Sequence, residues 1–180
     1  MLHSKKVCTL PANPDDEIKR TNEIKIAIPL LDAIEIKGKE VTADALLTQR
    51  ELANYIVGRQ AHYCFTVKGN QPKLLDDITF YFHDRKEPDF IDKTSCSHGR
   101  IEIRKIWTTT ELNDYVNFPH VGQAFVIERH CTDKKSGHSS SEVAYGIYSQ
   151  NPEQADAKHV LNLNRGHWSI ENSCHYIIDW

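Results

Sequence analysis

Two acidic residues that lie far apart in the chain have surroundings suited to metal or acid–base chemistry. Near the C-terminus, the stretch NRGHWSIENSCHYIIDW places Trp168, Glu171 and His175 at spacings i, i+3 and i+7. On a helix this spacing puts an aromatic ring, a carboxylate and an imidazole on one face. Glu171 is therefore a candidate functional group, although a solvated or salt-bridged helix carboxylate has the same pattern, because most helix carboxylates are exposed.

Asp44 is the second candidate, because it follows the short β-branched stretch EVTA at 40–43. In open α/β sheets, ligands gather at the carboxyl ends of the strands. The alternative is a plain turn residue, since Asp favours turns. Two carboxylates that converge can hold Mg²⁺ or Mn²⁺, which prefer oxygen ligands, and paired metal ions activate water in phosphodiester cleavage. Such a site normally needs a third carboxylate.

The first half of the chain predicts the elements that would carry Asp44. Apolar spacing favours a helix over 22–34, broken or kinked at Pro29, and then a turn at Gly38 before the strand EVTA. A helix over 48–60, a strand and turn over 61–71 and a helix over 72–84 follow. Thr48 and Glu51 have capping-box spacing at the start of the 48–60 helix. Strand, helix, strand and helix in this order imply a parallel crossover and an α/β core.

The second half changes to a period of two, which is typical of antiparallel strands. Strand-like stretches lie at 99–110, 123–131 and 140–149. DKKSG at 133–137 predicts a hairpin loop. We expect a β-rich block at about 98–149 that is attached to the α/β part or extends it. From Pro152 onward the pattern predicts a helix to the end of the chain.

Composition narrows the class of protein. The chain has 180 residues, about one domain, with 39% hydrophobic and 26% charged residues, as in ordinary globular proteins. It lacks a membrane-spanning run and a signal peptide, so we expect a cytoplasmic prokaryotic protein with no membrane partner. Five scattered cysteines suggest reduced thiols rather than a disulfide framework. The net charge of −3 gives no basic excess that would indicate nucleic-acid binding.

Two long segments carry a resemblance to a known family. TNEIKIAIPLLDAIEIKGKEVTADALLTQRELANYIVGRQAHYCFTVKGNQPKLLDDI at 21–78 and RGHWSIENSCHYIIDW at 165–180 resemble the ISAs-type, H-repeat-associated insertion-sequence transposases. The resemblance covers about residues 20–180, and its motifs occur in the right order. It implies a DDE-type enzyme with a ribonuclease-H-like core, here one domain over 1–180 whose β-rich insertion lies at about 98–149.

The resemblance also assigns site residues. It implies that Asp44 is the second catalytic acid and Glu171 the third, and that both are ligands of Mg²⁺ or Mn²⁺. It further suggests DNA contacts at Lys68, Arg165 and His167. For Lys68 a solvated strand-end lysine is the alternative, and His167 could instead orient the carboxylate or simply be packed. The implied partners are transposon ends and target DNA, with a homo-oligomer in complete relatives and a nucleoid-associated location.

Two departures from the family pattern change the expected activity. The wider superfamily has Tyr-x2-Arg-x3-Glu-x6-Lys around its last acid, and here those positions are Asn164, His167, Glu171 and Ile178. The first acid of such enzymes lies in an Asp-Gly-Lys setting on the first strand, and this sequence has no such segment. Asp15 and Asp16 lie in a polar turn and are poor substitutes. We therefore expect an incomplete core that lacks the first strand, in a chain truncated at both ends.

The leading interpretation is a DDE-type transposase domain that cleaves and transfers DNA strands and is inactive or weakly active without its first acid. The alternative is a non-catalytic transposase remnant that binds DNA or a full-length transposase. A third possibility is an unrelated metal-dependent nuclease, which the specific segments VKGNQ and RGHWSIEN disfavour.

Overall fold

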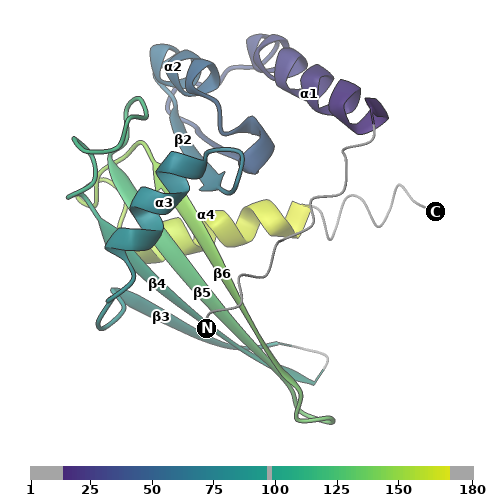
Figure 1. Ribbon diagram of the computed structural model, residues 1–180, viewed down its shortest axis with the longest axis vertical. Coiled ribbons are helices and arrows are strands. Elements are labelled where there is room, and N and C mark those ends of the chain that lie inside the picture. The colour runs from purple at the N-terminus through teal and green to yellow at the C-terminus, as the bar shows by residue number, and fades with distance from the viewer. Residues whose placement is uncertain (1–13, 97–98, 171–180) are drawn as a thin grey trace, which may run out of the picture.

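The computed structural model describes residues 14–96 and 99–170 as a mixed α/β structure (Figure 1). Its six strands form one sheet in the order β1-β2-β6-β5-β4-β3. In chain order the elements are α1 (Pro14–Asp32), β1 (Glu40–Ala43), the 3-10 turn η1 (Ala45–Leu47), α2 (Arg50–Gly58), β2 (His62–Val67), α3 (Pro72–Tyr81), β3 (Phe90–Cys96), β4 (Arg100–Thr109), β5 (Gln123–Asp133), β6 (Ser139–Tyr148) and α4 (Ala157–Ile170).

The crossover predicted from the sequence is present. β1 pairs with β2 in parallel, with Glu40 opposite His62 and Ala43 opposite Phe65, and α2 connects the two strands. The strand EVTA has the predicted bounds. Because the strands are parallel, the residues that follow them, Asp44 and Lys68, lie together at the carboxyl ends of these strands.

The antiparallel strands continue the same sheet. β6 pairs with β2, with Val67 opposite Tyr145, and β5, β4 and β3 follow as antiparallel neighbours. Of the two expected arrangements, the β-rich block therefore extends the α/β part. β3 has no counterpart among the predicted strands, because FIDKTSC is largely polar and its partner β4 is what holds it in the sheet.

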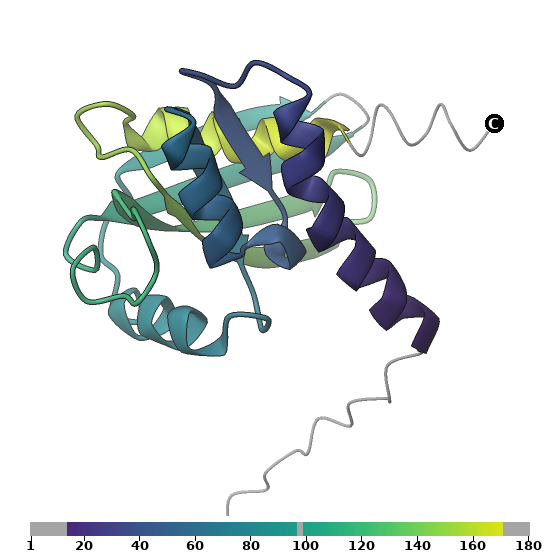
Figure 2. The same cartoon turned by 90° about the horizontal axis from the view of Figure 1, so that it is seen from above.

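Helices cover both faces of the sheet, and each face has its own apolar core. Ile56 of α2 and Ile78 of α3 are fully buried on one face, where parts of α1 also pack. Val160 and Leu161 of α4 are buried on the other face, against Ile106 of β4 and other strand residues. Figure 2 shows the sheet between α4 on one side and α3 on the other.

The expected break at Pro29 does not occur, because α1 runs unbroken from Pro14 to Asp32 with Pro29 inside it. Proline removes one helical hydrogen bond, here the one to the carbonyl of Lys25. Pro29 lies in the last turn, and both it and Lys25 are exposed, so water can satisfy that carbonyl. The cost is small enough for the helix to continue.

Two further boundaries differ from those predicted. α2 begins at Arg50 without a side-chain cap, because the Thr48 hydroxyl donates instead to the carbonyl of Thr66 at 2.6 Å. The capping box was therefore wrong. α4 begins at Ala157 rather than near Pro152, and an Oδ1 of Asp156 accepts the backbone N–H of His159 at 2.8 Å, as an N-cap does. The predicted helix beyond residue 170 lies outside the described residues.

Two expectations from composition can be compared with the structure. Cys64, which is buried, and Cys131, which is partly exposed, are both free thiols, as the scattered cysteines predict. Burial raises the pKa of the Cys64 thiol to about 12. In the described part of the chain, none of the helices has the length and apolar character needed to cross a membrane.

Candidate functional site

Asp44 is exposed and stands directly after β1, where its backbone is extended (φ −72°, ψ 178°). Its Oδ1 accepts the backbone N–H groups of Leu46 at 3.1 Å and Leu47 at 3.4 Å, so it caps η1. This capping fixes the side chain. Oδ2 has no hydrogen bond or ion pair with any described residue and is available to water or a cation. The turn-residue interpretation and the ligand interpretation of Asp44 are thus compatible.

Three side chains hold the Asp44 turn in place: Thr48, which the sequence assigned to a capping box, and Asn70 and Gln71, which it left without a role. The buried Thr48 donates to the Thr66 carbonyl on β2, and the amide of Gln71 donates to the carbonyl of Thr48 at 2.9 Å. The amide of Asn70 donates to the carbonyl of Ala45. The KGNQ turn after β2 is therefore bonded directly to the turn after β1. In the sequence, this link could have been inferred from Asn70 and Gln71, two side-chain amides that come just after the strand that pairs with β1.

Lys68 is exposed and immediately follows β2, at the same edge of the sheet as Asp44. This position is suitable for a contact with a substrate phosphate near Asp44. A DNA contact at Lys68 stays a prediction.

α4 lies against β1 and makes two polar contacts with it. His159 Nε2 is 2.7 Å from Oε1 of Glu40, and His167 Nδ1 is 3.2 Å from the hydroxyl of Thr42. In both elements the second of these contacts lies further toward the C-terminus than the first. α4 therefore runs in the same direction as β1, toward the strand end that Asp44 follows. Glu171, one turn after His167 in sequence, lies outside the described residues.

The two remaining predicted DNA contacts are placed differently. His167 is partly buried against β1, as the orienting or packed alternatives require. Arg165 forms an ion pair with Asp92 on β3 at 3.2 Å and keeps 41% of its side chain exposed. The structure thus brings His167 toward the Asp44 strand, and it places Arg165 beside the opposite edge strand. Their binding to DNA stays a prediction.

The donor set at Asp44 can be compared with the needs of Mg²⁺ or Mn²⁺. A free carboxylate oxygen on a fixed side chain is the kind of ligand that these cations prefer. Among the described residues, however, no group of three or more His, Cys, Asp or Glu side chains could hold a metal ion. Asp44 therefore fits as one ligand of a site that needs further carboxylates, of which Glu171 is the predicted one.

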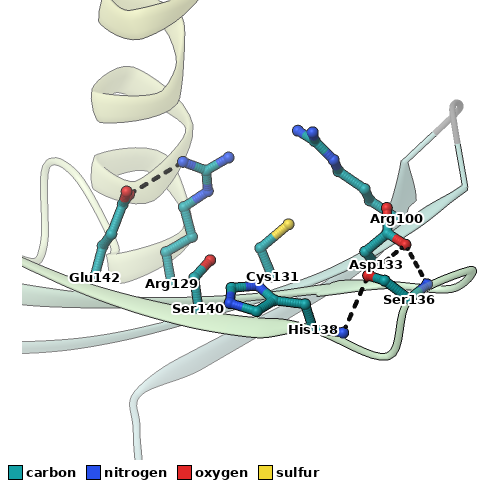
Figure 3. Close-up of a pocket in the computed structure, with 8 residues that line it drawn as sticks. All are labelled: Arg100, Arg129, Cys131, Asp133, Ser136, His138, Ser140 and Glu142. Carbon is teal, nitrogen blue, oxygen red and sulfur yellow. Dashed lines mark hydrogen bonds and ion pairs between the residues drawn. The ribbon is translucent and has the colours of Figure 1, made fainter.

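A separate cavity of about 430 Å³ lies where β4, β5 and β6 extend beyond the end of β2 (Figure 3). It is lined by Arg100, Arg129, Cys131, Asp133, Ser136, His138, Ser140 and Glu142. Arg129 is paired with Glu142 at 3.1 Å and with the buried Glu102 at 3.2 Å. The two lining arginines are matched by two lining carboxylates. The cavity therefore lacks the basic excess of a nucleic-acid site.

Comparison with known proteins identifies the family to which this mixed α/β chain belongs. The chain matches the family model of the transposase DDE domain over residues 16–180 and belongs to that family. This agrees with the resemblance seen in the sequence.

Curated relatives carry names consistent with the family. The chain is 28% identical over 169 residues to the putative transposase YncI of Escherichia coli O157:H7, a match that covers 89% of this chain and 43% of that protein. It is 28% identical over 171 residues to the H repeat-associated putative transposase YhhI of Escherichia coli strain K12, covering 89% and 44%. The related YbfD of the same strain is 36% identical over 90 residues, covering 48% and 36%. The chain thus spans less than half the length of these relatives.

Proposed function

We propose that this chain is the part of a DDE-type DNA transposase that supplies two of the three metal-binding carboxylates, Asp44 and Glu171. In this proposal the reaction is metal-dependent cleavage of a DNA strand followed by transfer of the freed 3′ end to target DNA. The partners are transposon ends and target DNA. The working form is a homo-oligomer associated with the nucleoid.

The observation that carries the proposal is the contact between His167 of α4 and Thr42 of β1 at 3.2 Å. Asp44 is two residues beyond Thr42, about 7 Å further along an extended strand. Glu171 is one turn beyond His167, about 6 Å further along a helix. If α4 continues for that turn, the two carboxylates advance together along neighbouring elements and can share a cation.

The third acid would come from outside this span of sequence. Among the described residues β1 is paired only with β2, so its other edge is open. A strand from elsewhere in the complete enzyme would pair with this edge and bring its acid beside Asp44. The result would be a ribonuclease-H-like core, in which the first strand adjoins the strand that carries the second acid.

The residues of this chain would then act in defined ways. Asp44 and Glu171 would hold Mg²⁺ or Mn²⁺, which supplies Lewis-acid stabilisation of the attacking and leaving oxygens. Thr48, Asn70 and Gln71 would keep the Asp44 turn rigid. Lys68, at the same edge as Asp44, would contact a phosphate. With only two of the three acids, the isolated chain would cleave DNA weakly or not at all.

The test uses the full chain and two measurements. Binding of Mn²⁺ is followed by electron paramagnetic resonance, and nicking of supercoiled plasmid is followed with Mg²⁺ or Mn²⁺. We expect Asp44→Ala and Glu171→Ala each to weaken Mn²⁺ binding and to reduce any metal-dependent nicking to background. Asp84→Ala and Glu153→Ala, which remove exposed carboxylates elsewhere, are the matched controls and should match the parent.

The open edge of β1 also favours the alternative, a non-catalytic remnant that associates with a full-length transposase through this strand. This candidate predicts no nicking by the parent and no dependence of Mn²⁺ binding on Asp44 or Glu171. It also predicts co-purification with a full-length relative, which Thr42→Pro should abolish, because the backbone N–H of Thr42 faces the open edge of β1 and not β2. Mn²⁺ binding that is weakened in both Asp44→Ala and Glu171→Ala would favour the catalytic proposal over this alternative.

A further inference from the structure

Both outermost strands of the sheet contact α4, so the sheet curls around this helix. On the β1 side the contacts are made by Glu40 and Thr42, as described above. On the β3 side, Asp92 is paired with Arg165, and the Lys158 ammonium lies 5.9 Å from the centre of the Phe90 ring. Helix α4 is thus joined by side-chain contacts to both outermost strands, including β1, which carries Glu40.

Glu40 accepts hydrogen bonds from two different elements, α4 and β6. Its Oε1 accepts His159 Nε2 at 2.7 Å and also the hydroxyl of Tyr148, a fully buried residue on β6. Partial burial by itself would raise the pKa of Glu40, but the hydrogen bonds from Tyr148 and His159, with the charges of His159 and His62, lower it overall. Glu40 is therefore ionised at neutral pH, and its hydrogen bonds are charge-assisted.

Apolar packing alone would not set the position of α4 along the sheet. The buried Val160 and Leu161 hold the helix on the strands, but apolar burial is non-directional. A short charge-assisted hydrogen bond is directional and has a narrow range of length. The contact at Glu40 fixes the beginning of α4, and the contact at Thr42 fixes a point about two turns later.

We propose that Glu40 and His159 are positioning residues that set the placement of α4 along β1, the strand that Asp44 follows, and thereby raise the metal affinity of the proposed site. The inference rests on the proposed function, because it assumes that Glu171 is a metal ligand. Neither Glu40 nor His159 would touch the metal ion. Glu40 and His159 would affect metal binding only through the position of α4. The hydrogen bond from Tyr148 would keep the Glu40 carboxylate oriented toward His159.

The test compares His159→Ala with His159→Gln, because glutamine can restore a hydrogen bond to Glu40. We expect His159→Ala to weaken Mn²⁺ binding about tenfold, the scale found when residues that orient metal ligands are removed, and His159→Gln to recover most of it. Glu40→Ala should resemble His159→Ala, and the double variant should bind no more weakly than either single variant. The matched control is His130→Ala, which removes the partly exposed His130–Glu128 pair on β5.

Amide hydrogen exchange provides a second measurement that is independent of metal. Residues 161–170 should exchange faster in His159→Ala than in the parent and the His130→Ala control. Unchanged exchange there, or unchanged Mn²⁺ affinity in His159→Ala while Asp44→Ala loses binding, overturns the positioning role alone. If Mn²⁺ binding depends on neither Asp44 nor Glu171, the proposed function fails and this inference fails with it.

Discussion

Thr48 shows how a single hydroxyl links the turn after β1 to the sheet. The residue is fully buried, and its hydroxyl donates to the Thr66 carbonyl on β2 at 2.6 Å. Its own carbonyl accepts the amide of Gln71. Because both partners lie on or just after β2, the turn that Asp44 caps is tied to the neighbouring strand by two hydrogen bonds.

We expect Thr48→Val to lower the free energy of unfolding by about 1–3 kcal/mol, because it keeps the shape of the side chain but leaves the Thr66 carbonyl without this donor. Urea denaturation measures the change. Thr132→Val, which removes an exposed hydroxyl bonded to Ser139, is the control and should change stability by less than about 0.5 kcal/mol. Equal effects of the two substitutions would show that the Thr48 bond does not hold the turn.

At the scale of elements, Gly146 is required by the packing of the central strands. It stands on β6 opposite Phe125 of β5 and Thr66 of β2. A Cβ atom there would lie less than 3.0 Å from three atoms of the Phe125 ring, which is itself fully buried. The ring has no room to move without disturbing the core between the sheet and α4.

Gly146→Ala is therefore expected to destabilise the protein by about 1–3 kcal/mol through overpacking. The matched substitution is Gly166→Ala in α4, where an added Cβ meets no described atom within 4 Å. There alanine should stabilise the helix by up to about 1 kcal/mol, because glycine is a poor helix former. Thermal unfolding of the two variants should move in opposite directions, and the same sign for both would contradict the packing argument.

Local pattern predicted those elements whose partners are close in sequence. The parallel pair β1 and β2, with α2 between them, followed from β-branched runs, helical spacing and the order of elements. The position of Asp44 at the strand edge followed as well. β3 was missed because its largely polar sequence pairs only through β4, and the break expected at Pro29 failed because exposed helix ends tolerate proline.

The supporting contacts of the candidate site could not be predicted in the same way. Thr48 was assigned to a capping box because Glu51 follows at the right spacing, yet its hydroxyl bonds a strand 18 residues away. Glu40 and His159 are 119 positions apart, and nothing in either local sequence indicates their contact. Such pairs depend on how α4 crosses the sheet, which only the folded structure defines.

At the scale of the whole molecule, Glu40 makes stability depend on pH. Its pKa in the folded state is lowered below 4.5, so its contribution is fully present above the unfolded pKa and is lost as pH falls through the folded value. We expect Glu40→Gln to lower the urea midpoint at pH 7, and the difference from the parent to shrink between roughly pH 5 and pH 3. Glu153→Gln, an exposed control, should show no such trend. A constant difference across this range would argue against an ionised Glu40 as the source.

Helix α4 has two roles in this fold, and their combination has a thermodynamic consequence. The helix closes one face of the hydrophobic core and also leads into the predicted last metal ligand. Any fluctuation that lifts it from the strands uncovers Ile106 and Phe125 to water at the same time. In the proposed function, metal binding and global cooperativity would thereby be coupled, and a partly unfolded species that still binds metal would be disfavoured.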